Sequence, residues 1–164
     1  MIIKKIQVVF LIISIFAVIV LLRNWYSSYN FQKNPISEEY QKAIGIEEQR
    51  VLKNMQKSFG FQYKVPLIIT DKIPGKVYGV TSLSDDGAIK IYLNKKVMKE
   101  SIDYILSDVI AHEYAHALLF KTGAYKNKRD GHSKLWQNTC VKLGGAKCTK
   151  YVDSHDVIMG KLPF

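Results

Sequence analysis

The sequence predicts an α+β fold in which a single domain follows one apolar helix. Three observations lead to this prediction: an apolar run near the N-terminus, three short β-rich segments in the middle of the chain, and helical periodicity on both sides of them. A chain of 164 residues has room for one domain plus an appendage, and a hydrophobic content of 48% is sufficient for a packed core. We therefore expect a small three-stranded antiparallel sheet packed on helices, behind an N-terminal transmembrane helix.

The apolar run over residues 6–22 is predicted to anchor the chain in a membrane. Only Gln7 and Ser14 interrupt it, and as a helix it would be about 26 Å long, at the short end for a bilayer span. Aromatic residues follow the run, as is typical of the membrane interface. A cleaved signal peptide is the alternative, but the run lacks the small-x-small pattern of a cleavage site. We interpret residues 1–23 as an uncleaved signal anchor and residues 24–35 as a tether.

The charges beside the predicted span give a slight orientation signal. Lys4 and Lys5 precede the span, whereas Arg23 and Lys33 follow it. With the α-amino group, three positive charges precede the span, so the positive-inside bias slightly favours a cytoplasmic N-terminus. On this basis we expect a single-pass membrane protein whose domain, residues 36–164, lies outside the cytoplasm.

Charge and cysteine content limit the classes of partner and site. The net charge of +10 suits anionic partners such as lipid head groups, cell-wall polymers or nucleic acid. The basic residues are scattered, with their densest group at 126–129, so nucleic-acid binding is possible but not favoured. The two cysteines, Cys140 and Cys148, are too few for a four-cysteine zinc ribbon. They would either form one disulfide in an oxidising compartment or remain two buried thiols.

Capping residues and turns define the first elements of the domain. Ser37 is a helix start signal, and Gly60 is a helix stop for an amphipathic helix between them. The segments 61–70, 77–83 and 88–93 are predicted strands. They are separated by turn signals at Pro74-Gly75 and at Asp85-Asp86-Gly87. If the third strand were a sheet edge near the active site, an extended peptide could pair with its backbone.

The central motif is His112-Glu113-x-x-His116 within an apolar helix predicted over residues 101–121. Residues four apart lie on the same face of a helix, so both imidazoles can reach one zinc ion. Glu113 can then take a proton from a water activated by the ion. The alternative is a core helix whose two histidines are satisfied by other partners. Asp108 could orient His112, although a surface aspartate is the favoured interpretation.

A third zinc ligand is needed, and few candidates follow the motif. No glutamate occurs after Glu113, so a downstream glutamate ligand is excluded. Two histidines remain, His132 and His155. His132 directly precedes a helix predicted over residues 135–143, from which it can return to the motif helix, whereas His155 lies in a polar tail. We therefore predict His132 as the third ligand.

These residues resemble the SprT-like zinc metalloprotease domain, which includes the Spartan-type proteases. The resemblance covers about residues 36–148 and rests on the motif together with Gly131-His132-Ser133-x-x-Trp136 and the helix that ends at Gly144. It implies a minimal zincin-like fold, bound Zn²⁺, proteolysis and an open, shallow cleft. Carried over by position, it implies zinc ligands and a general base at His112, His116, His132 and Glu113. The four-cysteine ribbon of many members is absent from this sequence, which places the family's association with DNA-bound substrates in doubt.

The sequence thus predicts a membrane-anchored zinc metalloprotease that hydrolyses peptide bonds in a protein or peptide substrate, with Glu113 as general base. The oxyanion donor is left open among Tyr125, Tyr151 and His155. Three alternatives remain: a zinc hydrolase acting on cell-wall peptides, a non-catalytic metal-binding or interaction module of the envelope, and a cytoplasm-facing protease acting on nucleic-acid-bound proteins. The oligomeric state is left open.

Overall fold

The computed structural model describes residues 2–75, 77–125 and 131–149 of the chain. It divides into two compact units, Met1–Ile36 and Ser37–Phe164, each of which is described by itself. The second unit combines a small sheet with helices, so the predicted α+β class is confirmed.

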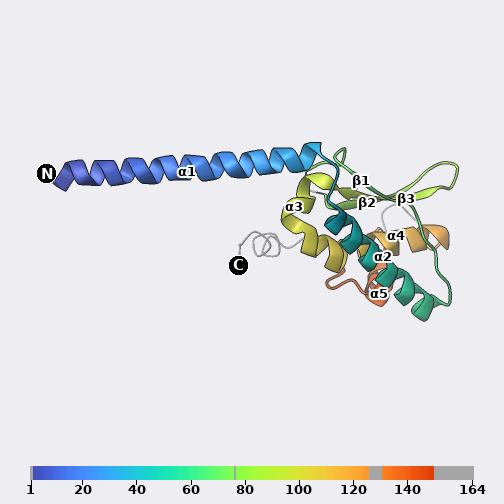
Figure 1. Cartoon of the computed structure of the whole chain (residues 1–164). Helices are drawn as coiled ribbons and strands as arrows, with labels where there is room; N and C mark the ends of the chain where they lie inside the picture. The colour runs from blue at the N-terminus through green and yellow to red at the C-terminus, as the bar shows by residue number, and fades with distance from the viewer. Residues whose placement is uncertain (1, 76, 126–130, 150–164) are drawn as a thin grey trace. The chain divides into compact units, whose positions relative to one another are not determined.

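The first unit is one long helix, α1, which spans Ile2–Lys33 (Figure 1). The helix Lys4–Lys33 contains an 18-residue window with a mean hydropathy of 2.8 and is long and apolar enough to cross a membrane, features that a signal sequence shares. Ser14 Oγ donates a hydrogen bond to the Phe10 carbonyl at 2.9 Å, which satisfies this hydroxyl within the helix. Because α1 continues to Lys33, most of the segment 24–35, which we expected to be a tether, is helical.

The sheet of the second unit is mixed. It contains β1 (Leu67–Thr70), β2 (Gly79–Leu83) and β3 (Ile89–Asn94), in the order β1-β3-β2. The hairpin partners β2 and β3 are antiparallel, whereas β1 pairs in parallel with β3. The expectation of an antiparallel sheet was therefore wrong for one of the two pairings. The reason is the loop between β1 and β2, which carries the chain past β3 to the opposite edge.

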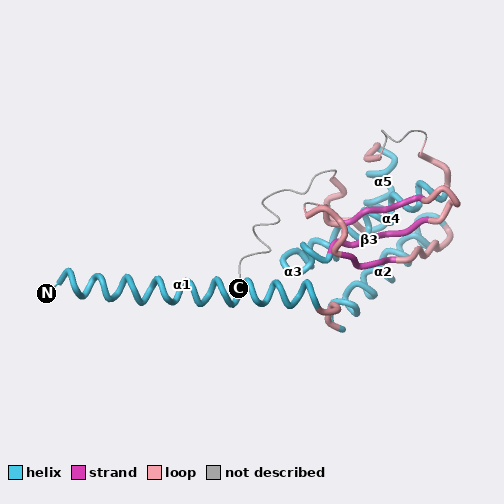
Figure 2. Tube along the Cα trace, turned by 90° about the horizontal axis from the view of Figure 1, so that it is seen from above, coloured by secondary structure: helices cyan, strands magenta, loops and turns pink. Residues whose placement is uncertain are grey.

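Because β3 lies in the middle of the sheet (Figure 2), it is not the edge that we considered for peptide pairing. Asn94, fully buried at the end of β3, holds the preceding loop in place. Its Nδ2 donates to the Pro74 carbonyl at 3.1 Å and to the Val77 carbonyl at 2.6 Å. Its Oδ1 accepts from the Lys96 N–H and so caps the next helix. One side chain thus ties together the loop, the central strand and the helix that leads to the motif.

The helices are α2 (Glu38–Phe59), α3 (Lys95–Tyr104), α4 (Ile110–Lys121) and α5 (Lys134–Leu143). The caps Ser37, Gly60 and Gly144 confirm the predicted ends of α2 and the predicted C-terminal end of α5. The helix α5 begins one residue before the predicted start and is capped by Ser133. The predicted motif helix ends at Lys121 as expected, but it begins earlier and is interrupted. Ser101 has non-helical backbone angles, and a π-helical turn, η1 (Ile105–Val109), separates α3 from α4.

The helix α4 forms the centre of the domain, because it contacts α2, α5, β2 and β3. The sheet makes one layer and the helices α2, α4 and α5 make the other (Figures 1 and 2). Within α4, Tyr114 is fully buried and donates a hydrogen bond of 2.6 Å to Glu48 Oε1 on α2. Lys64 Nζ lies 3.1 Å from the same carboxylate, so this buried charge is compensated. These contacts hold α4 in position and so fix the polar residues on its opposite face.

Candidate metal centre

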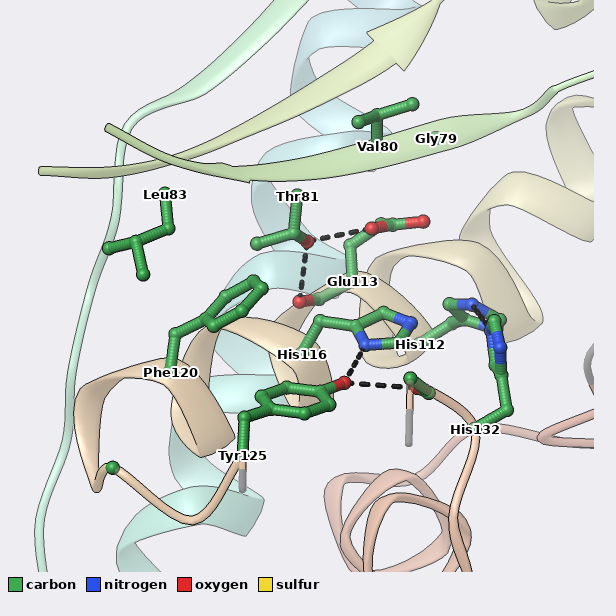
Figure 3. Close-up of a pocket in the computed structure, with 12 residues that line it drawn as sticks. Gly79, Val80, Thr81, Leu83, His112, Glu113, His116, Phe120, Tyr125 and His132 are labelled. Carbon is green, nitrogen blue, oxygen red and sulfur yellow. Dashed lines mark hydrogen bonds between the residues drawn. The ribbon is translucent and has the colours of Figure 1, made fainter. Parts of the chain in front are cut away.

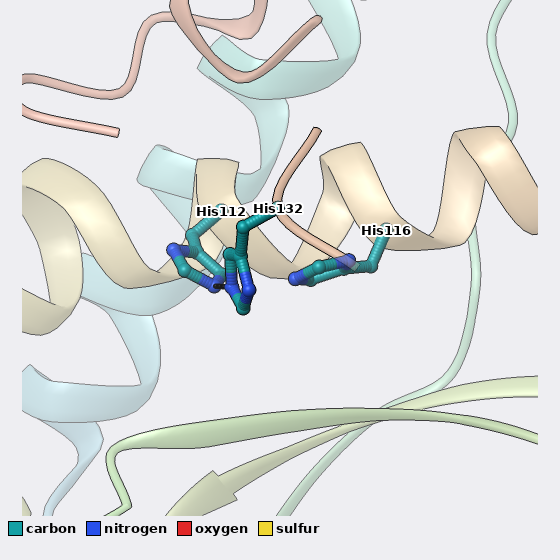
Figure 4. A group of neighbouring side chains, drawn as sticks. All are labelled: His112, His116 and His132. Carbon is teal, nitrogen blue, oxygen red and sulfur yellow. Dashed lines mark hydrogen bonds between the residues drawn. The ribbon is translucent and has the colours of Figure 1, made fainter. Parts of the chain in front are cut away.

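Three histidines converge on one point of the domain. His112 and His116 lie one turn apart on α4, and His132 comes from the segment before α5 (Figure 4). One ring nitrogen from each lies within 4.8 Å of the others, and His132 Nε2 is 3.1 Å from His112 Nε2. In a tetrahedral zinc site with Zn–N bonds of 2.0–2.1 Å, neighbouring ligand nitrogens are about 3.3 Å apart. These histidines could therefore bind one metal ion.

The tautomer of His116 follows from the hydrogen bonds of Tyr125. The Tyr125 hydroxyl donates to the Gly131 carbonyl at 3.0 Å, and burial raises its pKa, so it keeps that proton. The same oxygen contacts His116 Nδ1 and must accept from it. His116 therefore carries its proton on Nδ1 and presents the Nε2 lone pair to the centre. The hydroxyl also holds Gly131, the residue before His132.

The Trp136 indole packs against all three imidazoles. Its indole is 1% exposed and its ring centroid lies 4.5 Å from those of His112 and His132 and 5.2 Å from that of His116. Its Nε1–H donates to the His112 carbonyl at 3.4 Å. Because Ser133 caps α5 at the Trp136 N–H, the helix start positions His132 and the indole together.

Burial keeps two of the histidines neutral. Desolvation, followed by the charge of neighbouring histidines, lowers the pKa of His112 to about 4 and that of His116 to about 3. Near neutral pH both rings are therefore neutral, each with one N–H and one nitrogen lone pair, which is the form that binds a metal.

Glu113 lies beside the histidines and against β2. Its Oε2 accepts a hydrogen bond of 2.7 Å from the Thr81 hydroxyl, and Thr81 Oγ1 also lies 2.9 Å from the Glu113 carbonyl (Figure 3). Burial raises the pKa of Glu113 to about 7, while the hydrogen bonds from Thr81 oppose that rise. A carboxylate with this pKa can accept a proton and return it near neutral pH.

Gly79 allows β2 to approach Glu113 closely. A Cβ at this position would lie 2.9 Å from both Glu113 Cγ and Val109 Cγ1. Cβ atoms essentially never lie this close to other heavy atoms, so a side chain at position 79 would force Glu113 or Val109 to shift.

Asp108 is fully buried, which contradicts the interpretation as a surface aspartate. Its Oδ1 accepts from the Lys147 and Cys148 N–H groups at 2.9 and 3.0 Å, and its Oδ2 accepts from the Tyr104 hydroxyl at 3.3 Å. These hydrogen bonds tie Asp108 to Tyr104 and to the segment after α5 rather than to His112. Cys148 in that segment forms a disulfide with Cys140 of α5, which resolves the alternative that the sequence left open.

An open cleft of about 780 Å³ leads to the three histidines and Glu113. Its other lining residues come from β2, the end of α4 and the loop that follows: Gly79, Val80, Thr81, Leu83, Phe120, Gly123, Tyr125 and Gly131 (Figure 3).

Sequence reasoning missed the roles of several residues in this centre. Nothing in the sequence singled out Gly79 or Thr81, although a glycine that opens a predicted strand was a possible signal of close backbone approach. Tyr125 was considered as an oxyanion donor, but its hydroxyl is engaged by His116 and Gly131. The other two oxyanion candidates, Tyr151 and His155, lie outside the described residues, as does the basic group at 126–129.

Comparison with known proteins adds one finding. The family model described as the SprT-like family matches residues 35–155, which is well over half of the chain. A search among curated proteins returned no match.

Proposed function

The chain belongs to the SprT-like family, and from this premise we propose that it is a membrane-anchored, zinc-dependent metallopeptidase. The family suggests a zincin-like metalloprotease-type domain. The observation that carries the proposal is the convergence of three histidine nitrogens beside a buried carboxylate, at the bottom of an open cleft. Binding alone would not require Glu113 at this place, which favours catalysis over a passive metal site.

The donor set fits zinc better than other common ions. Three imidazole ligands with an open side are typical of catalytic zinc, whereas calcium and magnesium prefer oxygen ligands. We assign His112, His116 and His132 as the ligands. A bound zinc ion would lower the pKa of a water molecule and polarise the scissile carbonyl.

Within the reaction, this chain supplies a base and holds it in place. Glu113 takes the proton of the attacking water and passes it to the leaving nitrogen of the peptide bond. Thr81 keeps one carboxylate oxygen fixed, and Gly79 leaves room for the carboxylate against β2. Tyr125 and Trp136 hold the imidazoles, so the base and the ligands keep one relative position.

The substrate is proposed to be an extended segment of a protein or peptide. In the described part of the chain, β2 pairs only with β3, so its other edge is open to backbone pairing. Four of its five residues line the cleft. A peptide paired with this edge would pass directly over Glu113.

We infer that the domain faces an oxidising compartment outside the cytoplasm, with α1 as its anchor. Two independent features support this placement: the lysines before the apolar run and the disulfide between Cys140 and Cys148. Alkylation of thiols in intact cells tests it. Both cysteines should be protected from alkylation until a reductant is added, and free thiols in the native protein would contradict the placement.

Metal content and turnover test the proposed function on the full-length protein in detergent. We expect about one zinc per chain by elemental analysis, and cleavage of a labelled unfolded protein. His132→Ala should lose most of the zinc, whereas His155→Ala should keep it. Glu113→Gln should keep the zinc and lose about 10²–10⁴-fold in rate. A folded protein that binds no zinc would contradict the proposal, and zinc binding without any turnover would favour the non-catalytic module.

A further inference from the structure

The cleft is apolar at the end beyond His116. Leu83 of β2 and Phe120 of α4 both line it there, and Figure 3 shows them on the same side of Glu113 and His116. Leu83 is 49% exposed although it is a large apolar residue, and Val80 on the same strand is 39% exposed. The Phe120 ring packs against the Tyr125 ring at a centroid distance of 4.7 Å, so this wall is held in shape.

Charge is scarce along the same surface. The protein carries a net charge of +10, yet Glu113 and the three histidines are the only titratable groups apart from Tyr125 among the described residues that line the cleft. Glu113 is bonded to Thr81, and the histidines are the metal ligands of the proposed function. Among the described residues, the apolar end therefore offers no partner to a charged side chain, which would lose its hydration there without compensation.

The repeat of the strand and the repeat of the helix set the distance between the apolar end of the cleft and the proposed reacting centre. On β2, Leu83 follows Thr81 by two residues, so both side chains lie on one face about 6.6 Å apart along the strand. On α4, Phe120 follows His116 by four residues, so both lie on one face about 6 Å apart along the helix. Leu83 and Phe120 therefore lie at similar distances from Thr81 and His116, respectively, and towards the same end of the cleft (Figure 3). A peptide paired with β2 would place a side chain next to the scissile bond at this end.

We propose that Leu83 and Phe120 form a subsite for a bulky apolar side chain beside the scissile bond, and that the preferred substrates are extended, unfolded protein segments. This inference rests on the proposed metallopeptidase function. The second part follows from the first, because large apolar side chains are mostly buried in folded proteins and become available when a segment is unfolded.

The cleavage preference tests the subsite. The zinc-loaded full-length protein in detergent is incubated with a mixture of peptides of diverse sequence, and the cut positions are identified by mass spectrometry. Matched fluorogenic peptides then vary a single residue at the enriched position. We expect leucine, phenylalanine or methionine to be cleaved at least about tenfold faster, in kcat/KM, than lysine or aspartate. Equal rates for all of these residues would overturn the subsite.

A substitution in the wall provides the second test. Leu83→Lys places a cation at the apolar end, so the preference should move from apolar towards acidic side chains. Ile46→Lys is the matched control, because Ile46 is 63% exposed on α2 and does not line the cleft. An unchanged preference in Leu83→Lys would contradict the assignment. Cleavage without any apolar preference removes the subsite alone, whereas no cleavage of any peptide by zinc-loaded protein removes the proposed function and the subsite with it.

Discussion

The two sides of the candidate metal centre are built differently. Behind the histidines lies a support wall that consists of Asp108, Trp136 and the disulfide between Cys140 and Cys148, and each of these four residues is at most 1% exposed. In front lies an open face made by Gly79, Thr81, Leu83, Phe120 and Tyr125, which line the cleft. The wall is satisfied by hydrogen bonds and close packing within the domain, whereas the face leaves apolar surface and a strand edge exposed.

This difference suggests that the two sides have separate roles: the support wall holds the proposed ligands, and the open face admits a substrate. The support wall should determine stability and metal retention, because every loss there leaves buried groups without partners. The open face should determine turnover and preference, because a peptide must reach Glu113 from that side. Variants on the two sides are therefore expected to change different measurements.

Among variants that keep the proposed ligands and Glu113, the largest effect is expected for Gly79→Ala on the open face. The new Cβ would collide with Glu113 Cγ and Val109 Cγ1 and would displace the base. A displacement of about 1 Å at a catalytic group can cost about 10²-fold in rate. Gly75→Ala is the control, since a Cβ there meets nothing within 4 Å. Turnover should fall about 10²-fold with unchanged zinc content, and equal turnover of the two variants would refute the role of Gly79.

In the support wall, replacing both Cys140 and Cys148 by alanine should lower the free energy of unfolding by about 2–3 kcal/mol. The disulfide closes a short loop, at a sequence separation of 8, whose N–H groups bind the buried Asp108. Chemical denaturation of the zinc-free protein measures the loss. Wild-type protein treated with a reductant should unfold at the same denaturant concentration as the variant. A variant as stable as the oxidised wild type would show that the wall does not depend on this bond.

Tyr125→Phe sharpens the comparison, because this residue lines the open face but supports a ligand. Removal of the hydroxyl frees both His116 Nδ1 and the Gly131 carbonyl while it keeps the ring. Zinc affinity should fall about tenfold, as is usual when a hydrogen-bond partner of a ligand is lost. Competition with a zinc chelator measures this, with Tyr26→Phe, on α1, as a control outside the domain. An unchanged affinity would place Tyr125 with the substrate-binding residues only.

The smallest effect is expected for Thr81→Val, which removes the hydroxyl bonded to Glu113. The hydrogen bonds from Thr81 lower the pKa of this carboxyl, so their loss raises it further. The base acts in its deprotonated form, which is present above the pKa, so a raised pKa moves the acid limb of the pH–rate profile to higher pH. We expect a several-fold lower rate at mildly acidic pH and a smaller difference at alkaline pH. A limb that moves to lower pH would contradict the assigned hydrogen bond.

Local patterns predicted much of this domain because each depends on a few neighbouring residues. Ser37, Gly60 and Gly144 marked helix ends through their own side-chain chemistry or backbone freedom, and the structure confirms them. The i, i+4 spacing of the motif places His112 and His116 on one face of any helix. The convergence of His132 with them was expected from elimination and from the family resemblance, and the structure brings the three together.

What required the tertiary structure depends on contacts between distant residues. The parallel pairing of β1 with β3 follows from where a loop crosses, which strand patterns do not record. In the sequence, nothing distinguishes Asp108 from any other helical aspartate. Its burial depends on the N–H groups of Lys147 and Cys148, about forty residues later, which donate hydrogen bonds to its carboxylate. Gly79 and Thr81 acquire their roles only because β2 packs against α4.

By itself, therefore, the sequence determined the helix that bears the two motif histidines, the place of the proposed base Glu113 beside them and the apolar N-terminal helix, since these are properties of spacing and composition. Only the tertiary structure decided which strand forms the open edge, what orients each imidazole and which wall supports the centre. The physical reason is that hydrogen bonds and close packing join residues far apart in the chain, and their partners are chosen by the fold as a whole.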